Sequence, residues 1–252
     1  MTLEIICFII IFIYGLVIGS FLNVCIYRIP KHEDWAKQRS HCMKCGYQLK
    51  WYDLVPLISW ICLGGRCRKC KEKISIQYPI IELLNAFLYM VVFYVNGFNI
   101  LSILFCLLTS ALIVLSVIDF RTYEIPLGIN IFILALGLIQ LGMDYGNWKT
   151  YVIGLFTVSL PLYLIILLTK GKAMGGGDMK LMAVCGLLLG WQKIILAFVI
   201  GCIIGSVIHL IRMKVSKEQH VLALGPYLSV GVWFALLWGE PMIKIYLNYI
   251  GL

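Results

Sequence analysis

The chain has 252 residues, of which 62% are hydrophobic and 13% are charged, and its mean hydropathy is +0.94. A soluble globular chain is about 45–50% apolar and about 25% charged, so one core cannot hide this apolar surface and the remainder must face lipid. The composition excludes a soluble enzyme, a disordered protein and a secreted disulfide-rich mini-protein. In a membrane protein the net charge of +9 bears on orientation, and we expect no nucleic-acid partner.

Apolar stretches recur along the chain and predict about eight transmembrane helices. They cover residues 3–27, 77–95, 99–118, 127–143, 151–169, 179–190, 193–211 and 222–238. The sixth has 12 residues and would give only roughly 18 Å of helix, whereas the hydrocarbon core is about 30 Å thick. This span is therefore either shallow or extended by neighbouring residues. The sequence predicts an all-α polytopic membrane protein.

Basic residues are distributed unequally between the two sets of loops that eight spans would create. One side would carry the loops 28–76, 119–126, 170–180 and 212–221. These loops contain 18 of the 21 Lys and Arg residues, so they are predicted to be cytoplasmic and both termini external. We therefore expect a first transmembrane helix at 1–27, a cytoplasmic module at 28–76 and a seven-helix domain at 77–252.

The cytoplasmic module contains two CxxC pairs, Cys42 with Cys45 and Cys67 with Cys70, separated by 21 residues. Four thiolates on two tight turns are typical of a tetrahedral Zn²⁺ site, and Gly46 suits the turn after the first pair. Because four cysteines fill the coordination shell, we predict a structural ion, which so short a polar segment would also need in order to fold. The alternatives are a redox-active pair or unligated thiols, although a reducing cytoplasm argues against two disulfides.

Three of the twelve acidic residues, Glu82, Asp119 and Asp178, lie within or at the edge of an apolar span. A carboxylate there costs on the order of 2.5–3.5 kcal/mol, which indicates a function. Asp119 ends the third span and Asp178 begins the sixth after three glycines, so the topology places both at the cytoplasmic face. Two aspartates that share a proton can activate water and polarise a peptide carbonyl, as in aspartic proteolysis. The glycines would let a peptide strand approach closely.

Simpler interpretations of the three acidic residues remain open. Asp178 could be the N-cap of the sixth helix, and Asp119 could pair with Arg121. Glu82 could be a packing or hydrogen-bonding residue of the second helix. A proton-coupled transporter that uses membrane carboxylates is the alternative function, although it gives the zinc module no obvious role and no broken spans indicate inverted repeats. Neither a P-loop nor a GxSxG elbow is present.

Several motifs resemble those of type IV prepilin peptidases, the bifunctional leader peptidases and N-methyltransferases of pilus, type II secretion and competence systems. Besides the two CxxC pairs, the resemblance rests on the segments 19–30, 65–71, 74–75, 78–84, 119–126 and 175–181. Gly175-Gly-Gly-Asp178 matches the GxGD element of the family, and Asp119 with Ile125-Pro126 matches the position of its first aspartate. Leu127 stands where the family commonly has an acidic residue or Asn, a departure that concerns a helix cap and not the chemistry.

The resemblance implies an eight-span protein of the cytoplasmic membrane, with Asp119 and Asp178 as the catalytic pair at the cytoplasmic face. Its substrates would be prepilins or pseudopilins, cut after a glycine that ends a short basic leader. S-adenosylmethionine would be the cofactor that methylates the new N-terminal residue. No nucleotide-binding loop of the Rossmann type is present. Because the donor is cytoplasmic and the acceptor is released at the membrane, we place the methyl-donor site beside the cytoplasmic module, near Asn23 and Arg28 or Glu82.

Overall fold

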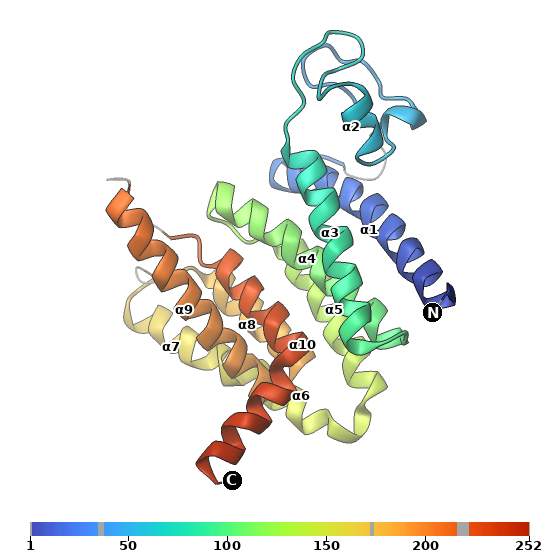
Figure 1. Cartoon of the computed structure of the whole chain (residues 1–252). Coiled ribbons are helices and arrows are strands. Elements are labelled where there is room, and N and C mark those ends of the chain that lie inside the picture. The colour runs from blue at the N-terminus through green and yellow to red at the C-terminus, as the bar shows by residue number, and fades with distance from the viewer. Residues whose placement is uncertain (1, 35–37, 172–173, 216–221, 252) are drawn as a thin grey trace. The chain divides into compact units, whose positions relative to one another are not determined.

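The computed structural model of the protein describes residues 2–34, 38–171, 174–215 and 222–251. Parts of three predicted cytoplasmic loops, residues 35–37, 172–173 and 216–221, lie outside the described residues. Within the described ranges the regular elements are helices, accompanied by two isolated β-bridges (Figure 1). The prediction of an all-α protein is confirmed.

The helices follow one another along the chain with short connections. The longer ones are α1 (Thr2–Arg28), α3 (Gln77–Asn96), α4 (Ile100–Thr122), α5 (Leu127–Met143), α9 (Trp191–Val215) and α10 (Gly225–Ile250). The shorter ones are α2 (Ile58–Cys62), α6 (Trp148–Thr157), α7 (Ser159–Leu168) and α8 (Gly176–Leu189), with 3-10 turns at Ile29–Lys31, Trp51–Asp53 and Tyr145–Asn147. They form two compact units, Met1–Val114 and Leu115–Leu252, and the division falls within α4.

Six helical stretches in the described part of the chain are long and apolar enough to cross a membrane. They are Leu3–Lys31, Gln77–Asn96, Ile100–Thr122, Tyr145–Leu168, Trp191–Lys214 and Gly225–Tyr249. The protein is therefore a multi-pass membrane protein, and these stretches coincide with six of the predicted spans. The last is longer than the predicted 222–238, because its helix continues through Pro241.

The two other predicted spans, 127–143 and 179–190, correspond to α5 and α8, which have 17 and 14 residues. At about 1.5 Å per residue, both helices are shorter than the hydrocarbon core of about 30 Å. A total of eight crossings therefore remains a prediction.

In the first unit, α1 and α3 pack side by side, and glycines of α1 permit their close approach (Figure 1). A Cβ at Gly15 would lie 2.5 Å from Ala86 Cα, and a Cβ at Gly19 would lie 2.6 Å from Glu82 Cα. Asn85 Nδ2 donates a 2.8 Å hydrogen bond to the carbonyl oxygen of Gly15. Gly15 and Gly19 form the small-xxx-small pattern that lets membrane helices pack closely. This contact holds the backbone of Glu82 against α1.

In the second unit, α8 packs against α5, α6, α7, α9 and α10. Most of its residues from Leu181 to Leu189 are buried, which explains why the helix is apolar all round although it is short. Its contact with α6 is very close: a Cβ at Gly186 would lie 2.1 Å from the carbonyl oxygen of Gly154, and a Cβ at Gly154 would lie 2.3 Å from the carbonyl oxygen of Gly186. Because protein surrounds α8, this helix does not need the full hydrocarbon length.

We predict that Gly186→Ala destabilises the second unit, because the added methyl group overlaps the backbone of α6 and forces the helices apart. Overpacking of this kind costs about 1–3 kcal/mol, which would lower the midpoint of thermal unfolding in detergent. Gly142→Ala on α5 is the matched control, since it gains the same helix propensity and no atom lies within 4 Å of its Cβ position. Equal midpoints for the two variants would contradict this packing.

Candidate functional site

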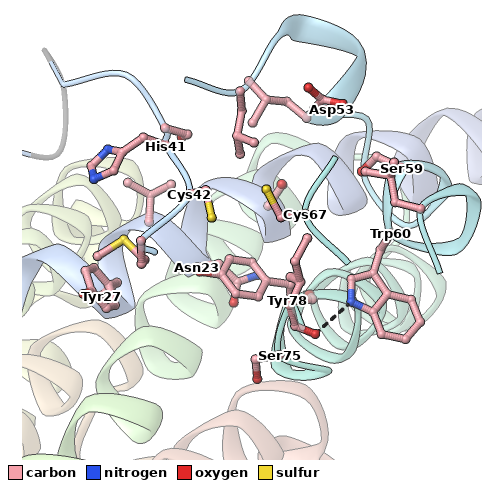
Figure 2. Close-up of a pocket in the computed structure, with 18 of the residues that line it drawn as sticks. Asn23, Tyr27, His41, Cys42, Asp53, Ser59, Trp60, Cys67, Ser75 and Tyr78 are labelled. Atoms are coloured by element: carbon pink, nitrogen blue, oxygen red, sulfur yellow. Dashed lines mark hydrogen bonds between the residues drawn. The ribbon is translucent and has the colours of Figure 1, made fainter. Parts of the chain in front are cut away.

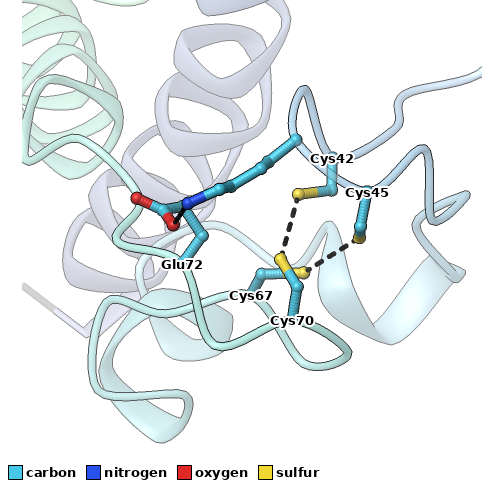
Figure 3. A network of polar contacts seen from close by, with 6 residues as sticks. Cys42, Cys45, Cys67, Cys70 and Glu72 are labelled. Carbon is cyan, nitrogen blue, oxygen red and sulfur yellow. Dashed lines mark hydrogen bonds and ion pairs between the residues drawn. The ribbon is translucent and has the colours of Figure 1, made fainter.

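The four cysteines of the two CxxC pairs meet in the first unit (Figure 3). Their sulfur atoms all lie within 4.8 Å of one another, with 3.8 Å between Cys42 Sγ and Cys70 Sγ and 4.0 Å between Cys45 Sγ and Cys67 Sγ. A tetrahedron with Zn–S bonds of about 2.3 Å has edges of roughly 3.8 Å. The spacing therefore fits a Zn²⁺ ion, which these four residues would hold.

The two CxxC pairs lie on turns of the same form. Gly46 follows the first pair with φ +67°, and Lys71 follows the second with φ +59°. The backbone N–H of each donates to the carbonyl oxygen of the first cysteine of its pair, Cys42 at 2.9 Å and Cys67 at 3.0 Å. A positive φ suits glycine but is uncommon for a residue with a Cβ. The two pairs therefore share one turn form, although a glycine takes the positive-φ position in one and a lysine takes it in the other.

Backbone N–H groups favour the thiolate form of the first cysteine. Hydrogen bonds from the backbone of Cys45 and Lys44 lower the pKa of Cys42 to about 6. The thiolate is the form that binds a metal ion. The Lys44 side chain also forms an ion pair with Glu72, so an exposed charge pair joins the two turns (Figure 3).

A buried aspartate supports the module beside the cysteine cluster. Asp53 is 9% exposed, and its carboxylate accepts hydrogen bonds from Arg68 Nε (2.8 Å) and from the backbone N–H of Lys50 (3.2 Å). Although burial raises the pKa of Asp53, the hydrogen bonds from Arg68 and Lys50 hold it below its usual range. This link therefore stabilises the module at neutral pH and is lost as the pH falls through the pKa of the folded state.

Asp119 lies near the end of α4, in the second unit, and is 4% exposed. The backbone N–H of Gly225, at the start of α10, donates a 2.9 Å hydrogen bond to Asp119 Oδ2 across 106 positions of sequence. The first N–H groups of a helix lack partners within the helix, and a helix N-terminus favours negative charge. The sequence analysis missed Gly225, although the Gly225-Pro226 pair that begins the last helix was a usable signal.

Asp178 lies in the first turn of α8, and Gly175 occupies the N-cap of that helix. The interpretation of Asp178 as a simple N-cap is therefore wrong. Asp178 and Asp119 both belong to the second unit. A Cβ at Gly177 would lie 3.0 Å from Ile125 Cβ, so the glycine run also packs against the segment that follows Asp119. The structure thus brings the two aspartate motifs together.

Both aspartates lie at helix N-termini, Asp178 on α8 itself and Asp119 against the start of α10. The positive ends of these helices offset part of the cost of placing two acidic groups in an apolar region. Such a pair can perform hydrolysis, since one carboxylate can activate water while the protonated partner polarises a carbonyl group.

Glu82, the third acidic residue of the apolar spans, belongs to the first unit. It is 5% exposed, and its Oε2 atom accepts a 2.9 Å hydrogen bond from the backbone N–H of Leu57. Leu57 has φ +59°, a conformation that is uncommon for leucine. Of the simpler interpretations of Glu82, the structure supports the hydrogen-bonding role.

Two family models match the chain: the bacterial peptidase A24 N-terminal domain at residues 13–96 and the type IV leader peptidase family at residues 106–210. The prepilin leader peptidase/N-methyltransferase of Pseudomonas putida is 31% identical over 270 residues, covering 95% of this chain and 93% of the relative. The proteins of the same name from Stutzerimonas stutzeri and Aeromonas salmonicida are each 33% identical. They cover 94% and 96% of this chain, and 92% and 94% of the relatives. No solved structure matches the chain significantly.

We predict that the purified protein contains about one equivalent of Zn²⁺, as a closed four-cysteine site requires. Cys42→Ser should lower both the metal content and the unfolding temperature, because a structural zinc ion contributes folding energy. Cys62→Ser is the matched control, since Cys62 is an exposed free cysteine outside the cluster. Metal analysis that finds less than about half an equivalent in folded wild-type protein would favour free thiols.

Proposed function

The chain belongs to the prepilin leader peptidase/N-methyltransferase family, and we propose that it removes the basic leader of type IV prepilins or pseudopilins. Cleavage follows a glycine at the cytoplasmic face of the cell membrane. The new N-terminal residue is then methylated with S-adenosylmethionine as the donor. The observation that supports the peptidase assignment is that Asp119 and Asp178 each lie at a helix N-terminus within one unit, with Gly177 packed against Ile125.

In this proposal Asp119 and Asp178 act as one catalytic unit. One carboxylate takes a proton from a water molecule while the water oxygen attacks the scissile carbonyl carbon, and the protonated partner gives its proton to the carbonyl oxygen. Collapse of the tetrahedral intermediate breaks the C–N bond: the carboxyl group that took the water proton gives it to the leaving amine, and a hydroxyl group of the intermediate gives a proton to the other carboxylate. The pair thereby returns to its starting state with one shared proton. The N–H of Gly225 holds the Asp119 carboxylate in position.

The proposed membrane arrangement has eight spans, with α5 and α8 added to the six longer stretches. It comprises a first helix at 1–27, a cytoplasmic zinc module at 28–76 and a seven-helix peptidase domain at 77–252, with both termini external. The unequal distribution of basic residues supports this orientation, since 18 of 21 fall on the cytoplasmic side. The packing of α8 among five helices supports its inclusion despite its length.

The methyl transfer needs different chemistry from the cleavage. The amine nitrogen of the cleaved pilin forms a bond to the methyl carbon of S-adenosylmethionine, the electrons of the broken C–S bond stay on sulfur, and the nitrogen releases a proton to water. The Zn²⁺ ion held by the four cysteines is structural and takes no part in either reaction. The family favours this enzyme over the alternative of a proton-coupled transporter, because the relatives are named for both activities.

We predict that Asp119→Asn and Asp178→Asn each abolish prepilin cleavage, because an amide of the same size cannot exchange the shared proton. A loss of about 10³-fold or more is expected. Both variants should still methylate a pilin supplied in its cleaved form, since methyl transfer depends on alignment and not on a carboxylate pair. The mass of the product N-terminus reports both reactions.

The matched control for these two variants is Asp144→Asn. Asp144 belongs to the same unit, but its carboxylate accepts hydrogen bonds from Asn147 and Tyr151. Substantial cleavage by either catalytic variant at normal expression would rule out the aspartate mechanism. Loss of methylation in both, with donor binding intact, would mean that one apparatus performs both reactions.

We predict that Gly225→Ala lowers prepilin cleavage about 10- to 100-fold, because a Cβ there would lie 2.6 Å from Asp119 Oδ2 and would displace the carboxylate. Gly128→Ala, near the start of α5, is the control, since no atom lies within 4 Å of its Cβ position. Zinc content and methylation of a cleaved pilin separate this effect from unfolding. Full cleavage by Gly225→Ala would show that the contact does not position Asp119.

A further inference from the structure

The short helix α2 of the cysteine module presents apolar side chains outward. Its residues Ser59 and Trp60 line the cavity between the module and the helices α1 and α3 (Figure 2). Ile58 and Ile61 lie outside this lining, and they are 61% and 67% exposed. Being three positions apart on a helix, they share one face. In a module surrounded by water this outward face would be polar, so its apolar character calls for a partner.

The structure places α2 at the depth where α3 enters the membrane. Leu57, the N-cap of α2, donates its backbone N–H to Glu82 Oε2 at 2.9 Å. Glu82 lies five residues after Gln77, or about 8 Å along the axis from the start of α3. The 20 residues of α3 measure about 30 Å, which is the thickness of the hydrocarbon core. The helix α2 therefore begins beside a membrane-spanning helix and not above its end.

The exposed side of α3 shows that lipid reaches the same depth. The apolar side chains Ile80, Leu83 and Phe87 are 51%, 44% and 60% exposed. Their spacing puts them on one stripe of the helix, and the first two lie within one turn of Glu82. Lipid that covers this stripe is therefore present at the level at which α2 begins.

Contacts on the inner side of α2 hold its outer face in place. Trp60 Nε1 donates a 3.4 Å hydrogen bond to the carbonyl oxygen of Ile74, which precedes α3. The backbone N–H of Gly65 donates to the carbonyl oxygen of Trp60 at 2.8 Å. A Cβ at Gly65 would lie 2.9 Å from the indole ring, so the chain after α2 packs directly on Trp60. With Trp60 fixed inward, the opposite face of α2 has to point outward.

An exposed tryptophan lies beside this outward face. Trp51 is 79% exposed, and it belongs to the 3-10 turn Trp51–Asp53, which packs against α2. The ring of Tyr52 meets the ring of Trp51 edge to face, with 5.6 Å between their centroids. Tryptophan and tyrosine are enriched where proteins cross the boundary between membrane and water. The aromatic pair is therefore suited to the headgroup layer of a bilayer.

The charge of the module favours an anionic surface. Residues 28–76 contain eleven basic and four acidic residues, a net charge of +7. Lys50 directly precedes Trp51, and Arg66 follows α2 by four residues; both are exposed. Basic residues next to membrane helices are attracted to the phosphate groups of anionic lipids. The same charge disfavours a basic partner at this face.

We propose that Ile58, Ile61 and Trp51 form an interfacial surface that inserts into the headgroup layer of the leaflet facing the module, and that its partner is an anionic lipid surface. Lys50 and Arg66 lie at the level of the lipid phosphates. Docking requires only that α3 crosses the bilayer, and neither of the two reactions proposed above. It holds α2 at a fixed depth beside α3.

The accessibility of Cys62 tests the docking. Cys62 is an exposed free cysteine that ends α2, and it lies on the same face as Ile58. In nanodiscs of phosphatidylcholine and phosphatidylglycerol in equal parts, a docked α2 shields this thiol from a charged maleimide. Ile61→Asp removes apolar contact with lipid and should let Cys62 react about tenfold faster, as peptide mass spectrometry would measure.

Two variants control for side-chain size and for charge. Ile61→Leu keeps an apolar side chain and should leave the reaction of Cys62 slow. Gln48→Asp adds the same negative charge at an exposed position outside α2 and should also leave it slow. Zinc content reports whether each variant is folded. Equal rates for wild type and Ile61→Asp would overturn the insertion of α2.

Lipid composition tests the part played by charge. In nanodiscs of phosphatidylcholine alone, Cys62 of the wild-type protein should react about fivefold faster than in the anionic nanodiscs, as expected when one basic side chain loses its contact with an anionic surface. Equal rates in the two kinds of nanodisc would overturn the choice of an anionic partner.

Photocrosslinking identifies the partner without relying on a destabilising variant. A benzophenone amino acid in place of Ile61 should attach to lipid in proteoliposomes of the same anionic mixture, whereas the same group in place of Gln48 should not. The mass of the adduct distinguishes lipid from protein. Attachment at position 61 to a second copy of the chain, or the absence of any lipid adduct there, would overturn the proposal.

Discussion

The organisation of the second unit depends on the cost of placing two carboxyl groups among apolar helices. Helix N-termini offset part of this cost. Asp178 lies in the first turn of α8, and the N–H of Gly225, at the start of α10, donates a hydrogen bond to Asp119. Both helix starts can reach the pair only if the helices pack closely. The contact between Gly154 and Gly186 provides this closeness, because it lets α8 lie directly against α6. The packing of small residues is therefore part of the arrangement that surrounds the two carboxyl groups.

The first unit also buries a carboxyl group, that of Glu82, but here a loop N–H and not a helix N-terminus donates to it. The cysteine cluster and the Asp53–Arg68 link give the polar module a fixed form. The module in turn directs the Leu57 N–H toward Glu82, which the Gly19 contact holds against α1. A structural zinc ion would thus do more than fold a loop, because it would maintain the cavity between the module and the two helices.

Local and compositional features could be read directly from the chain. The two CxxC pairs are close-range patterns, and the structure brings all four sulfur atoms within 4.8 Å. Hydropathy is a property of consecutive residues, so six spans were placed correctly. For the short helices α5 and α8, length alone does not decide whether they cross the membrane. Carboxylates in apolar stretches were conspicuous for the same reason, and the glycine run before Asp178 packs against Ile125 of the Asp119 segment.

The sequence by itself determined the helical membrane class, the cysteine cluster and the choice of the three acidic residues, because each follows from residue type and short spacing. Only the tertiary structure decided which groups these residues meet. Gly225 reaches Asp119 across 106 positions, and Leu57 reaches Glu82 across 25. The sequence does not indicate which backbone N–H will donate a hydrogen bond to a distant carboxylate, since every residue except proline has such a group. Its use depends on helix packing, and the packing depends on contacts that a single sequence does not display.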